Sequence, residues 1–517
     1  MKILMAAAEN GSFRGGKVGG IADVIRDIPP ALAATGQQVD VVVPGYGILA
    51  EQNNAVLIST ISVIFAGQAQ QVSVYQAASN ETEQITQWIF EHPIFSMCGS
   101  GKVYCNDPDS RPFASDATKF AFFSAAVATA VIDGLFGTVD VLHLHDWHTA
   151  TVLVLREFDA RFQALQSIHC VYTIHNLALQ GIRPFGDDQS SLNSWFPQLI
   201  INDQRVTDPR FPNCYNPMRA GISLSNKVHA VSPSYVAEIV QPSAPQLGFS
   251  GGEGLHETLC QAAKEQRLYG ILNGCEYPKQ ITKKLSFNKL IDLVQNEILN
   301  VIADKPLTDQ SLLIALTRLT QLSVKRVAPS MLVTSIGRVT TQKLQLLQQI
   351  MPNGETALEH ILTTLGHDGV FIMLGSGNSA LENFLTRIAA HHCNFIFIKG
   401  YFDCLPEQLY RSGDLFLMPS SFEPCGISQM LAMRAGQACL VHAVGGLKDT
   451  VIHNQTGFVF NGDTPLQQAE NMVDCFAEAL HIQQTEPIKW QQIKQQAKKA
   501  RFLWQDAAQQ YLQLLYR

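Results

Sequence analysis

The sequence is poor in charge and lacks any dense run of positive charge. Charged residues make up only 16% of its 517 residues, and the formal net charge is −7. Proteins that bind nucleic acid need clustered Lys and Arg to neutralise phosphates, so this composition argues against a nucleic-acid partner. The hydrophobic fraction of 46% supplies apolar material for two buried cores and does not indicate disorder.

Metal-binding and membrane signals are also missing. The 11 cysteines have no CxxC spacing, which argues against a structural zinc site. The chain opens with Met1-Lys2-Ile3-Leu4, which leads into a strand-like run and not into a signal peptide, and no apolar run reaches the roughly 18 residues that a membrane span needs. We therefore expect a cytoplasmic protein with reduced thiols and no membrane association.

The chain does contain a repeated alternation of apolar runs and helix-like segments. At 517 residues it exceeds what one core usually sustains, so we expect two domains. Runs typical of buried parallel strands occupy 2–8, 39–43, 139–144 and 171–174 in the first half, and 331–336, 370–374, 395–398, 415–418 and 438–444 in the second. Two such series, with glycine turns at strand ends, predict an α/β fold of two Rossmann-like domains facing each other across a cleft.

A glycine-rich turn follows the first apolar run, and four of its glycines flank Lys17. The backbone amides of such a turn can approach a phosphate closely, while the lysine adds a positive charge; a turn that is merely flexible is the alternative. Lys17 is followed by Val, so the pattern is not of the Walker type. A dinucleotide-dependent oxidoreductase is disfavoured as well, because no GxGxxG with an acid roughly 20 residues later follows the first strand.

Polar side chains crowd the carboxyl ends of two later strands. The run ending at Leu144 is followed by His145-Asp146-Trp147-His148, and the run ending at Ile174 is followed by His175-Asn176. Sugar hydroxyls need both donors and acceptors, and an aromatic face can stack on a sugar ring, so these residues predict a sugar site. Histidines that only satisfy packing are the alternative.

The stretch from Leu415 to Gly436 carries the most chemistry of the second half. Glu423 lies in a loop after an apolar strand, and a helix-like run follows from Ile427 to Gly436. Loops at the carboxyl ends of parallel strands bind ligands, and the first amides of a helix favour anions. A lone loop Glu is most often only solvated, but residues 445–450 form a second glycine turn at the same edge, which favours a phosphate-bearing ligand.

Taken in order, these motifs resemble those of bacterial glycogen synthase and plant starch synthase. The segments that carry the resemblance are 17–24, 145–148, 173–178, 230–233, 271–274, 337–338 with 342–343, 422–426 and 445–451. The tail, Phe502-Leu503-Trp504 with Ala507, Ala508 and Tyr511, is similar to the terminal helix that crosses back onto the first domain in this family.

The resemblance implies a GT-B glycosyltransferase that moves glucose from ADP-glucose to the nonreducing end of an α-1,4-glucan with retention of configuration. The implied domains are an N-terminal acceptor-side domain of starch synthase catalytic type (1–265), a C-terminal nucleotide-sugar domain (266–490) and a terminal helix (491–517).

The resemblance also implies residue roles. Glu423 would hold the glucose ring, His175 would contact the transferring glucose, and Asp146 would sit by the donor or acceptor hydroxyls. The departing diphosphate would be held by Lys17, Arg338 and Lys343. The further nucleotide-sugar residues would be Gly19, Gly20, Asp23, Gly377, Cys425, Gly426, Ile427, Gly445, Gly446 and Thr450.

Two fixed cations at a leaving diphosphate can do the work of a metal ion, and no carboxylate cluster of DxD type is placed to hold one. We therefore expect neither a metal nor a cofactor. UDP-glucose is an alternative donor, and another retaining GT-B glucosyltransferase or a non-catalytic glucan-binding paralogue are alternative functions. The retained charged groups argue against the paralogue. Nothing in the sequence indicates the oligomeric state.

The chain departs from the family pattern at several positions. Leu344 replaces a glycine, Glu276 stands where Asp is usual, and the Tyr usual near Leu179 is absent. Tyr277-Pro278 stands in place of Trp-x-Pro, and the helical, polar segment from about 280 to 330 matches poorly. These changes spare the charged groups. We therefore expect them to affect the preference for the donor base and the fit of the acceptor chain more than catalysis.

Overall fold

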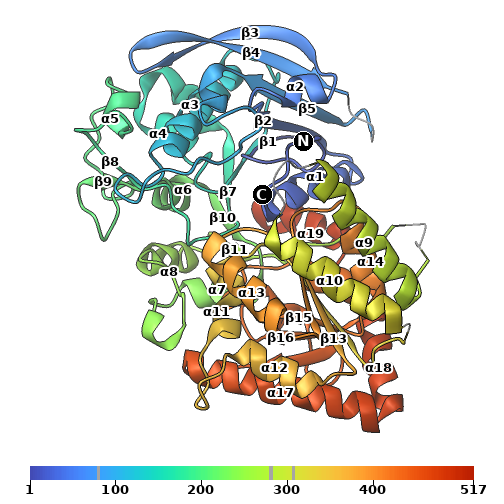
Figure 1. Ribbon diagram of the computed structural model, residues 1–517. Helices are drawn as coiled ribbons and strands as arrows, with labels where there is room; N and C mark the ends of the chain where they lie inside the picture. The colour runs from blue at the N-terminus through green and yellow to red at the C-terminus, as the bar shows by residue number, and fades with distance from the viewer. Residues whose placement is uncertain (79–81, 279–282, 305–308, 326) are drawn as a thin grey trace. The chain divides into compact units, whose positions relative to one another are not determined.

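The computed structural model describes residues 1–78, 82–278, 283–304, 309–325 and 327–517. The chain divides into two compact units, each built on one sheet with helices around it (Figure 1). Unit 1 comprises Met1–Ser243, Ser250–Gly274 and Leu503–Arg517, and unit 2 comprises Ala244–Phe249 and Cys275–Phe502. The expected α/β class is confirmed in both units.

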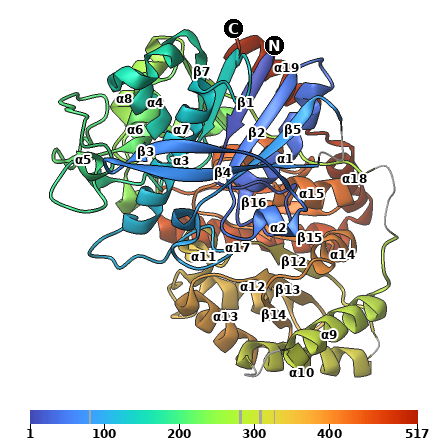
Figure 2. The ribbon, with the colours of Figure 1, turned by 90° about the horizontal axis from the view of Figure 1, so that it is seen from above.

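In the described part of unit 1 the sheet has nine strands in the order β11-β10-β7-β6-β1-β2-β5-β4-β3. These strands are β1 Lys2–Ala6, β2 Gln38–Pro44, β3 Val56–Phe65, β4 Gln68–Ala77, β5 Ile85–Glu91, β6 Val141–His145, β7 His169–Ile174, β10 Lys227–Ala230 and β11 Leu268–Gly270. The hairpin β3–β4 forms an antiparallel edge, where β4 also pairs antiparallel with β5 (Figure 2). The other pairs are parallel and buried on both faces, which is why they appear as apolar runs.

The helices of unit 1 are α1 Gly20–Ala33, α2 Leu49–Gln52, α3 Ala114–Ile132, α4 Thr151–Phe158, α5 Leu192–Trp195, α6 Pro217–Leu224, α7 Pro233–Ile239, α8 His256–Lys264 and α19 Trp504–Gln510, beside a small ribbon of β8 Arg183–Pro184 and β9 Cys214–Tyr215. Helix α3 is long and apolar enough to cross a membrane, so the expectation of no such run is wrong by that criterion. In the structure, 78% of its most apolar stretch is buried. Phe120, Phe122 and Phe123 lie in the core as expected.

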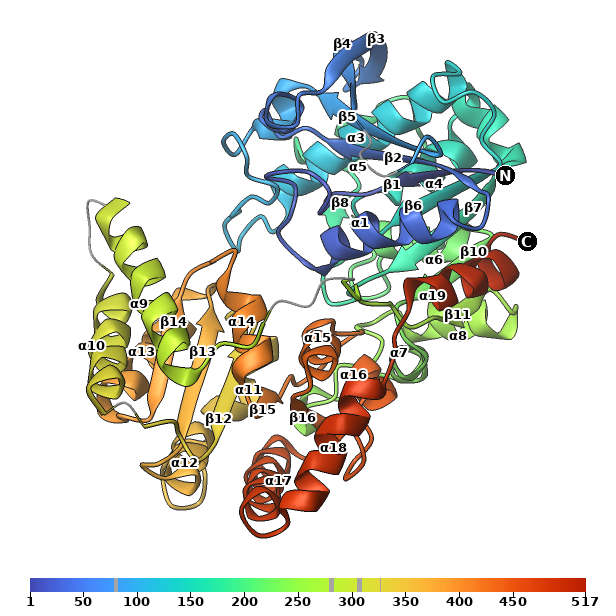
Figure 3. The ribbon, with the colours of Figure 1, turned by 90° about the vertical axis from the view of Figure 1, so that its right-hand side faces the viewer.

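The C-terminal tail is an integral part of unit 1. Helix α19 packs against α1 (Figure 3), and Trp504 Nε1 donates to Asp27 Oδ2 at 3.2 Å. A side chain at Gly274 would collide with the Trp504 backbone nitrogen, which its Cβ would approach to 2.5 Å. The ring of His169 bonds the Leu515 carbonyl at 2.7 Å, so the tail is also tied to the central sheet.

Among its described residues, unit 2 has a parallel sheet of six strands in the order β14-β13-β12-β15-β16-β17. The strands are β12 Leu332–Ile336, β13 Val370–Gly375, β14 Phe395–Lys399, β15 Leu415–Met418, β16 Ala438–His442 and β17 Gly457–Phe460. The helices are α9 Phe287–Asp304, α10 Gln310–Lys325, α11 Thr341–Gln348, α12 Ala357–Leu365, α13 Ser379–His391, α14 Leu405–Ser412, α15 Ser428–Ala435, α16 Gly445–Thr450, α17 Pro465–Thr485 and α18 Pro487–Lys499. The five strands expected from apolar runs are confirmed, and β17 was not expected.

The segment from about 280 to 330 is helical as expected, but it is not simply polar. Helices α9 and α10 bury an apolar face that includes Leu290, Val294 and Leu319. This face shares a core with strands β13 and β14. Residues 279–282, 305–308 and 326 of the segment lie outside the described residues.

One pair of cysteines contradicts the expectation of reduced thiols. Cys98 and Cys105 are joined by a disulfide. The nine other cysteines, all within the described ranges, take part in no disulfide. The bridge closes a short loop that carries Tyr104.

The disulfide predicts a measurable effect of reduction on stability. Closing a loop of this length stabilises by about 2 kcal/mol through the entropy of the unfolded chain. Reduction with dithiothreitol is expected to lower the urea midpoint of the transition that unfolds unit 1, followed by circular dichroism. The Cys98→Ser variant should already have the lower midpoint and should not respond to the reductant. Equal midpoints for the oxidised and reduced wild type would contradict the prediction.

Candidate active site

Glu423 and Lys343, predicted separately, bond directly to each other in unit 2. Strand β15 delivers the chain to a turn that places Glu423 only 7% exposed. Its Oε2 accepts from Ser420 Oγ at 3.0 Å and forms an ion pair with Lys343 Nζ at the start of α11. A carboxylate this buried needs such partners to stay ionised. Lys343 therefore already neutralises Glu423.

Helix α11 also fixes the backbone of the loop that carries Glu423. Gln342 Nε2 donates to the Phe422 carbonyl at 2.8 Å, and the Ser421 amide donates to the Gln342 carbonyl at 2.8 Å. From β16, the ring of His442 bonds the Ser420 carbonyl at 2.9 Å. The position of Glu423 is thus set by two neighbouring elements and not by the loop alone.

Two glycines are required where the next loop packs on Glu423. A Cβ at Gly445, whose φ is +42°, would lie 1.9 Å from the Glu423 carbonyl oxygen, and one at Gly446 would lie 2.3 Å from that of Cys425. The Gly446 amide donates to the Glu423 carbonyl at 3.1 Å. Thr450 Oγ1 in turn donates to the Gly446 carbonyl at 2.8 Å. The glycine turn therefore holds the Glu423 loop, a role that sequence reasoning missed.

Hydrogen bonds from one glutamine hold the turn that leads into α15. Gln429 Nε2 donates to the carbonyls of Cys425 at 3.2 Å and Gly426 at 2.9 Å. Gly426 has a φ of +74°, and Ile427 is the residue at which α15 is capped. The predicted group Cys425, Gly426 and Ile427 thus forms one rigid turn.

Arg338 lies on the loop after β12 and is exposed. It lines a pocket with Lys343, Met418 and Ser420. Gly377 lies beside this loop, because a Cβ there would meet the Val339 carbonyl oxygen at 2.3 Å. Unit 2 thus brings two predicted cations and the Glu423 loop together at the carboxyl edge of its sheet.

The glycine turn of unit 1 is organised by a residue that sequence reasoning missed. Glu9 is 2% exposed, and its Oε2 accepts from the amides of Val18, at 2.8 Å, and Gly19. Its Oε1 accepts from the Tyr104 hydroxyl at 2.6 Å. Amides expected to be open to a phosphate are therefore occupied by Glu9 in this structure. An acid placed directly after the first buried strand was the available signal.

Lys17 of this turn pairs with another predicted residue, Asp23, which lies in the first turn of α1. Lys17 Nζ lies 2.6 Å from Asp23 Oδ1. Gly20 begins α1, and a Cβ there would meet no atom within 4 Å, so its lack of a side chain is not a packing requirement.

Asp146 and His175 meet at the carboxyl ends of β6 and β7. Asp146, with a φ of +57° and 3% exposure, accepts the His175 amide on Oδ1 at 2.8 Å. Burial raises the pKa of Asp146 to about 8, against the opposing effect of its backbone hydrogen bonds. Burial also lowers the pKa of His175 to about 3. Both groups are therefore predominantly neutral near pH 7.

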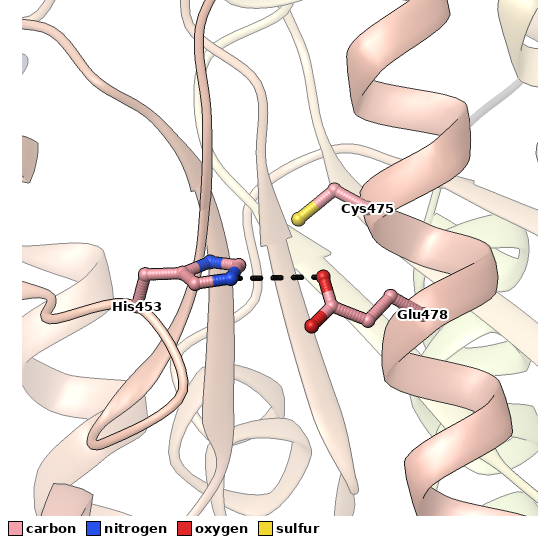
Figure 4. A group of neighbouring side chains, drawn as sticks. All are labelled: His453, Cys475 and Glu478. Atoms are coloured by element: carbon pink, nitrogen blue, oxygen red, sulfur yellow. Dashed lines mark ion pairs between the residues drawn. The ribbon is translucent and has the colours of Figure 1, made fainter.

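Another cluster in unit 2 has the residue types of a metal site but not the chemistry. His453, Cys475 and Glu478 each place one ligand atom within 4.8 Å of the others (Figure 4). His453 Nδ1 accepts from the Val459 amide at 3.1 Å, and His453 Nε2 lies 2.9 Å from Asn454 Nδ2, so both ring nitrogens already have partners within the protein. Burial raises the pKa of Cys475 to about 12, which keeps it a thiol. The cluster is a polar contact between the loop before β17 and helix α17, and we assign it no metal.

Comparisons with known proteins agree with this architecture. Residues 2–261 match the family model of the starch synthase catalytic domain, and residues 332–478 match that of glycosyl transferases group 1. Glycogen synthase of Streptococcus pneumoniae is 31% identical over 535 residues, which cover 100% of this chain and 99% of that protein. Glycogen synthase of Photobacterium profundum is 29% identical over 532 residues, with 99% and 94% covered.

Solved structures show the same fold. The catalytic domain of starch synthase IV from Arabidopsis thaliana, bound to ADP and acarbose, has a TM-score of 0.75 at 24% identity, with 99% of this chain and 98% of that chain covered. Sucrose-phosphate synthase from Thermosynechococcus elongatus has a TM-score of 0.54 at 15% identity, with the same coverage. The fold and the family models together define a glycosyltransferase of the GT-B class. Within that class, the chain belongs to the family of bacterial glycogen synthases and plant starch synthases.

The contact between the two glycine-dependent loops predicts a severe effect of Gly445→Ala. The new methyl group would lie 1.9 Å from the Glu423 carbonyl oxygen, so the Glu423 loop must shift and turnover should fall by about 100-fold. Gly354→Ala is the matched control, because Gly354 also has a positive φ, +89°, but a Cβ there meets nothing within 4 Å. Turnover and thermal unfolding of both variants check this. Equal losses of turnover would show that backbone strain, and not the loop contact, is responsible.

The raised pKa of Asp146 predicts how stability depends on pH. The folded protein keeps a proton that the unfolded chain releases above its ordinary pKa of 3.8, so this group lowers stability as pH rises from about 4 to about 8. Asp146→Asn should lack that decline, and Asn tolerates the positive φ. Urea midpoints at pH 5, 7 and 9 measure the effect, with exposed Asp109→Asn as the control. Parallel curves for wild type and Asp146→Asn would rule out the shifted pKa.

Proposed function

We propose that this protein transfers glucose from ADP-glucose to the nonreducing end of an α-1,4-glucan with retention of configuration. The observation that carries the proposal is the Glu423–Lys343 pair beside Arg338 at the carboxyl edge of the unit 2 sheet. It combines an acceptor for sugar hydroxyls with cations for a diphosphate. The ADP and acarbose bound to the starch synthase IV structure support a nucleotide donor and a glucan acceptor.

The negative charge that develops on the leaving group explains why the proposed site holds cations. Breaking the bond from glucose C1 to phosphate builds an oxocarbenium-like centre and a diphosphate anion. Lys343 and the exposed Arg338 stabilise that anion, and Glu423 accepts hydrogen bonds from the glucose hydroxyls. In this scheme the acceptor hydroxyl attacks on the face that the phosphate leaves, and the phosphate oxygen takes its proton. Fixed cations would make the reaction independent of a metal ion.

We assign the remaining predicted residues to the same reaction. His175 contacts the transferring glucose, and Asp146, protonated near neutral pH, donates to a donor or acceptor hydroxyl. Lys17, Gly19, Gly20 and Asp23 belong to the site that binds the nucleotide sugar, together with Gly377, Cys425, Gly426, Ile427, Gly445, Gly446 and Thr450. The acceptor side is residues 1–265, the nucleotide-sugar side 266–490 and the terminal segment 491–517, in a cytoplasmic enzyme.

Nucleotide release tests the donor, the acceptor and the metal requirement together. Purified protein is given ADP-glucose or UDP-glucose, with and without glycogen, in the presence of a chelator. We expect release of ADP that depends on glycogen and persists in the chelator. β-Amylase should then release the added glucose as maltose, because it cleaves α-1,4 chains from their nonreducing ends. UDP-glucose turnover alone would change the donor assignment, and glycogen binding without turnover of either donor would favour a non-catalytic paralogue.

Two variants tie the activity to the pair. Glu423→Gln is expected to lower turnover by orders of magnitude. Lys343→Gln should cost about 3 kcal/mol, on the order of 100-fold in rate, through loss of leaving-group stabilisation. Exposed Lys499→Gln in α18 is the control for loss of one positive charge. Near-normal turnover of either site variant removes that residue from the mechanism.

A further inference from the structure

We infer that His145 is a positioning residue for His175: it donates a hydrogen bond from Nδ1 to His175 Nε2 and so keeps the His175 proton on Nδ1. A ring held in this form presents an N–H to a sugar hydroxyl. The tautomer stands on the structure alone, and only its use on a sugar rests on the proposed function.

Strand register places the two imidazoles together. Strands β6 and β7 are parallel neighbours in which His145 lies opposite Thr173, and His175 follows just beyond. His145 Nδ1 and His175 Nε2 are 2.9 Å apart, and the ring planes are inclined by 31°. Asp146 holds the backbone amide of His175 at 2.8 Å. Two consecutive residues therefore fix the backbone and the ring of His175.

Behind His145 lie the side chains of His229, Thr173, His143 and Tyr516, which we call the wall. The direction of each hydrogen bond among them is fixed. The Ile271 carbonyl only accepts, so His229 Nε2, 3.2 Å away, carries the proton and His229 Nδ1 accepts from Thr173 Oγ1 at 3.0 Å. Thr173 Oγ1 must then accept from His143 Nε2 at 2.6 Å, which leaves His143 Nδ1 to accept from the Tyr516 hydroxyl at 2.8 Å. Each histidine ring in this series of hydrogen bonds is neutral and has one possible tautomer.

This wall holds the ring of His145 in place. The rings of His143 and His145 stack with centroids 4.3 Å apart and an interplanar angle of 24°. His145 thus lies between one ring whose tautomer is set and the ring of His175, with which it shares its hydrogen bond.

The unpaired nitrogen of His145 decides its tautomer. His145 Nε2 is buried and has no hydrogen-bond partner among the described residues. A proton there would be a buried donor without an acceptor, whereas a proton on Nδ1 leaves only a lone pair unpaired, which costs less. His145 therefore donates from Nδ1, and His175 Nε2 accepts. Burial, which lowers the pKa of both rings, excludes a charged form of either near pH 7.

Nitrogen NMR of histidine-labelled protein reads the tautomer directly. Two-bond couplings from the carbon-bound ring protons to the ring nitrogens distinguish a protonated Nδ1 from a protonated Nε2, and His145→Phe and His175→Gln assign the signals. We expect both rings of the wild type to be protonated on Nδ1. In His145→Phe, which has no donor, the His175 Nε2 signal should lose the shift of a nitrogen that accepts a hydrogen bond. A wild-type His175 protonated on Nε2, or a His175 Nε2 signal that is the same in His145→Phe and wild type, overturns the inference.

Kinetics separate positioning from simple structural damage. His145→Phe should lower kcat by about 100-fold with little change in the donor KM. His145→Asn should restore most of the loss, because its amide can donate from nearly the same place as Nδ1. His143→Asn alters the same wall but spares the 2.9 Å bond, so it is the control. Equal kcat values for His145→Phe and wild type, or equal losses in all three variants, overturn the positioning role.

The proposed function can fail separately from this inference. If the wild type turns over neither glucose donor, the proposed function is wrong, and the NMR result alone decides the inference. Thermal unfolding of the three variants identifies any that fail to fold. If His145→Phe does not fold, the same NMR criterion is applied to His145→Leu.

Discussion

The ion pair between Glu423 and Lys343 is the interaction on which the unit 2 site depends. Burying a carboxylate is costly unless it is paired and hydrogen-bonded, and Glu423 is only 7% exposed. The pair forms only if the Glu423 loop is held in one position. The contacts of Gln342 hold the loop there, and Gly445 and Gly446 allow it because they have no side chains that would collide with it. In the proposed reaction, Arg338 adds a second positive charge to that of Lys343, which Glu423 already partly offsets.

The fold could be predicted where burial produces a simple pattern of apolar residues in the sequence. Parallel strands buried on both faces, such as β13 and β15, form uninterrupted apolar runs and were found. Strands β11 and β17 each include a glycine, which shortens the apolar run to two or three residues. The α9–α10 pair was judged polar because its apolar residues recur with the helix period and are diluted by the exposed faces.

The site was predictable residue by residue but not as a set of contacts. Glu423 and Lys343 were each found from a local motif, yet their bond joins residues 80 apart and exists because β12 and β15 are neighbours in the sheet. Glu9 was missed although it directly follows the first apolar run, because a single acid does not reveal that the Val18 and Gly19 amides bond to it. Its other bond, to Tyr104, joins residues 95 apart and has no local signal.

The two kinds of site differ in charge, and burial explains the difference. Around β6 and β7, burial holds Asp146 protonated and His175 neutral, so these groups contribute hydrogen bonds without ionic desolvation. At the edge of the unit 2 sheet, Arg338 and Lys343 carry positive charge. Sugar hydroxyls are neutral and need oriented donors and acceptors, whereas a departing diphosphate needs cations. In the proposed reaction, neutral groups of unit 1 would orient the sugar while charged groups of unit 2 stabilise the leaving group.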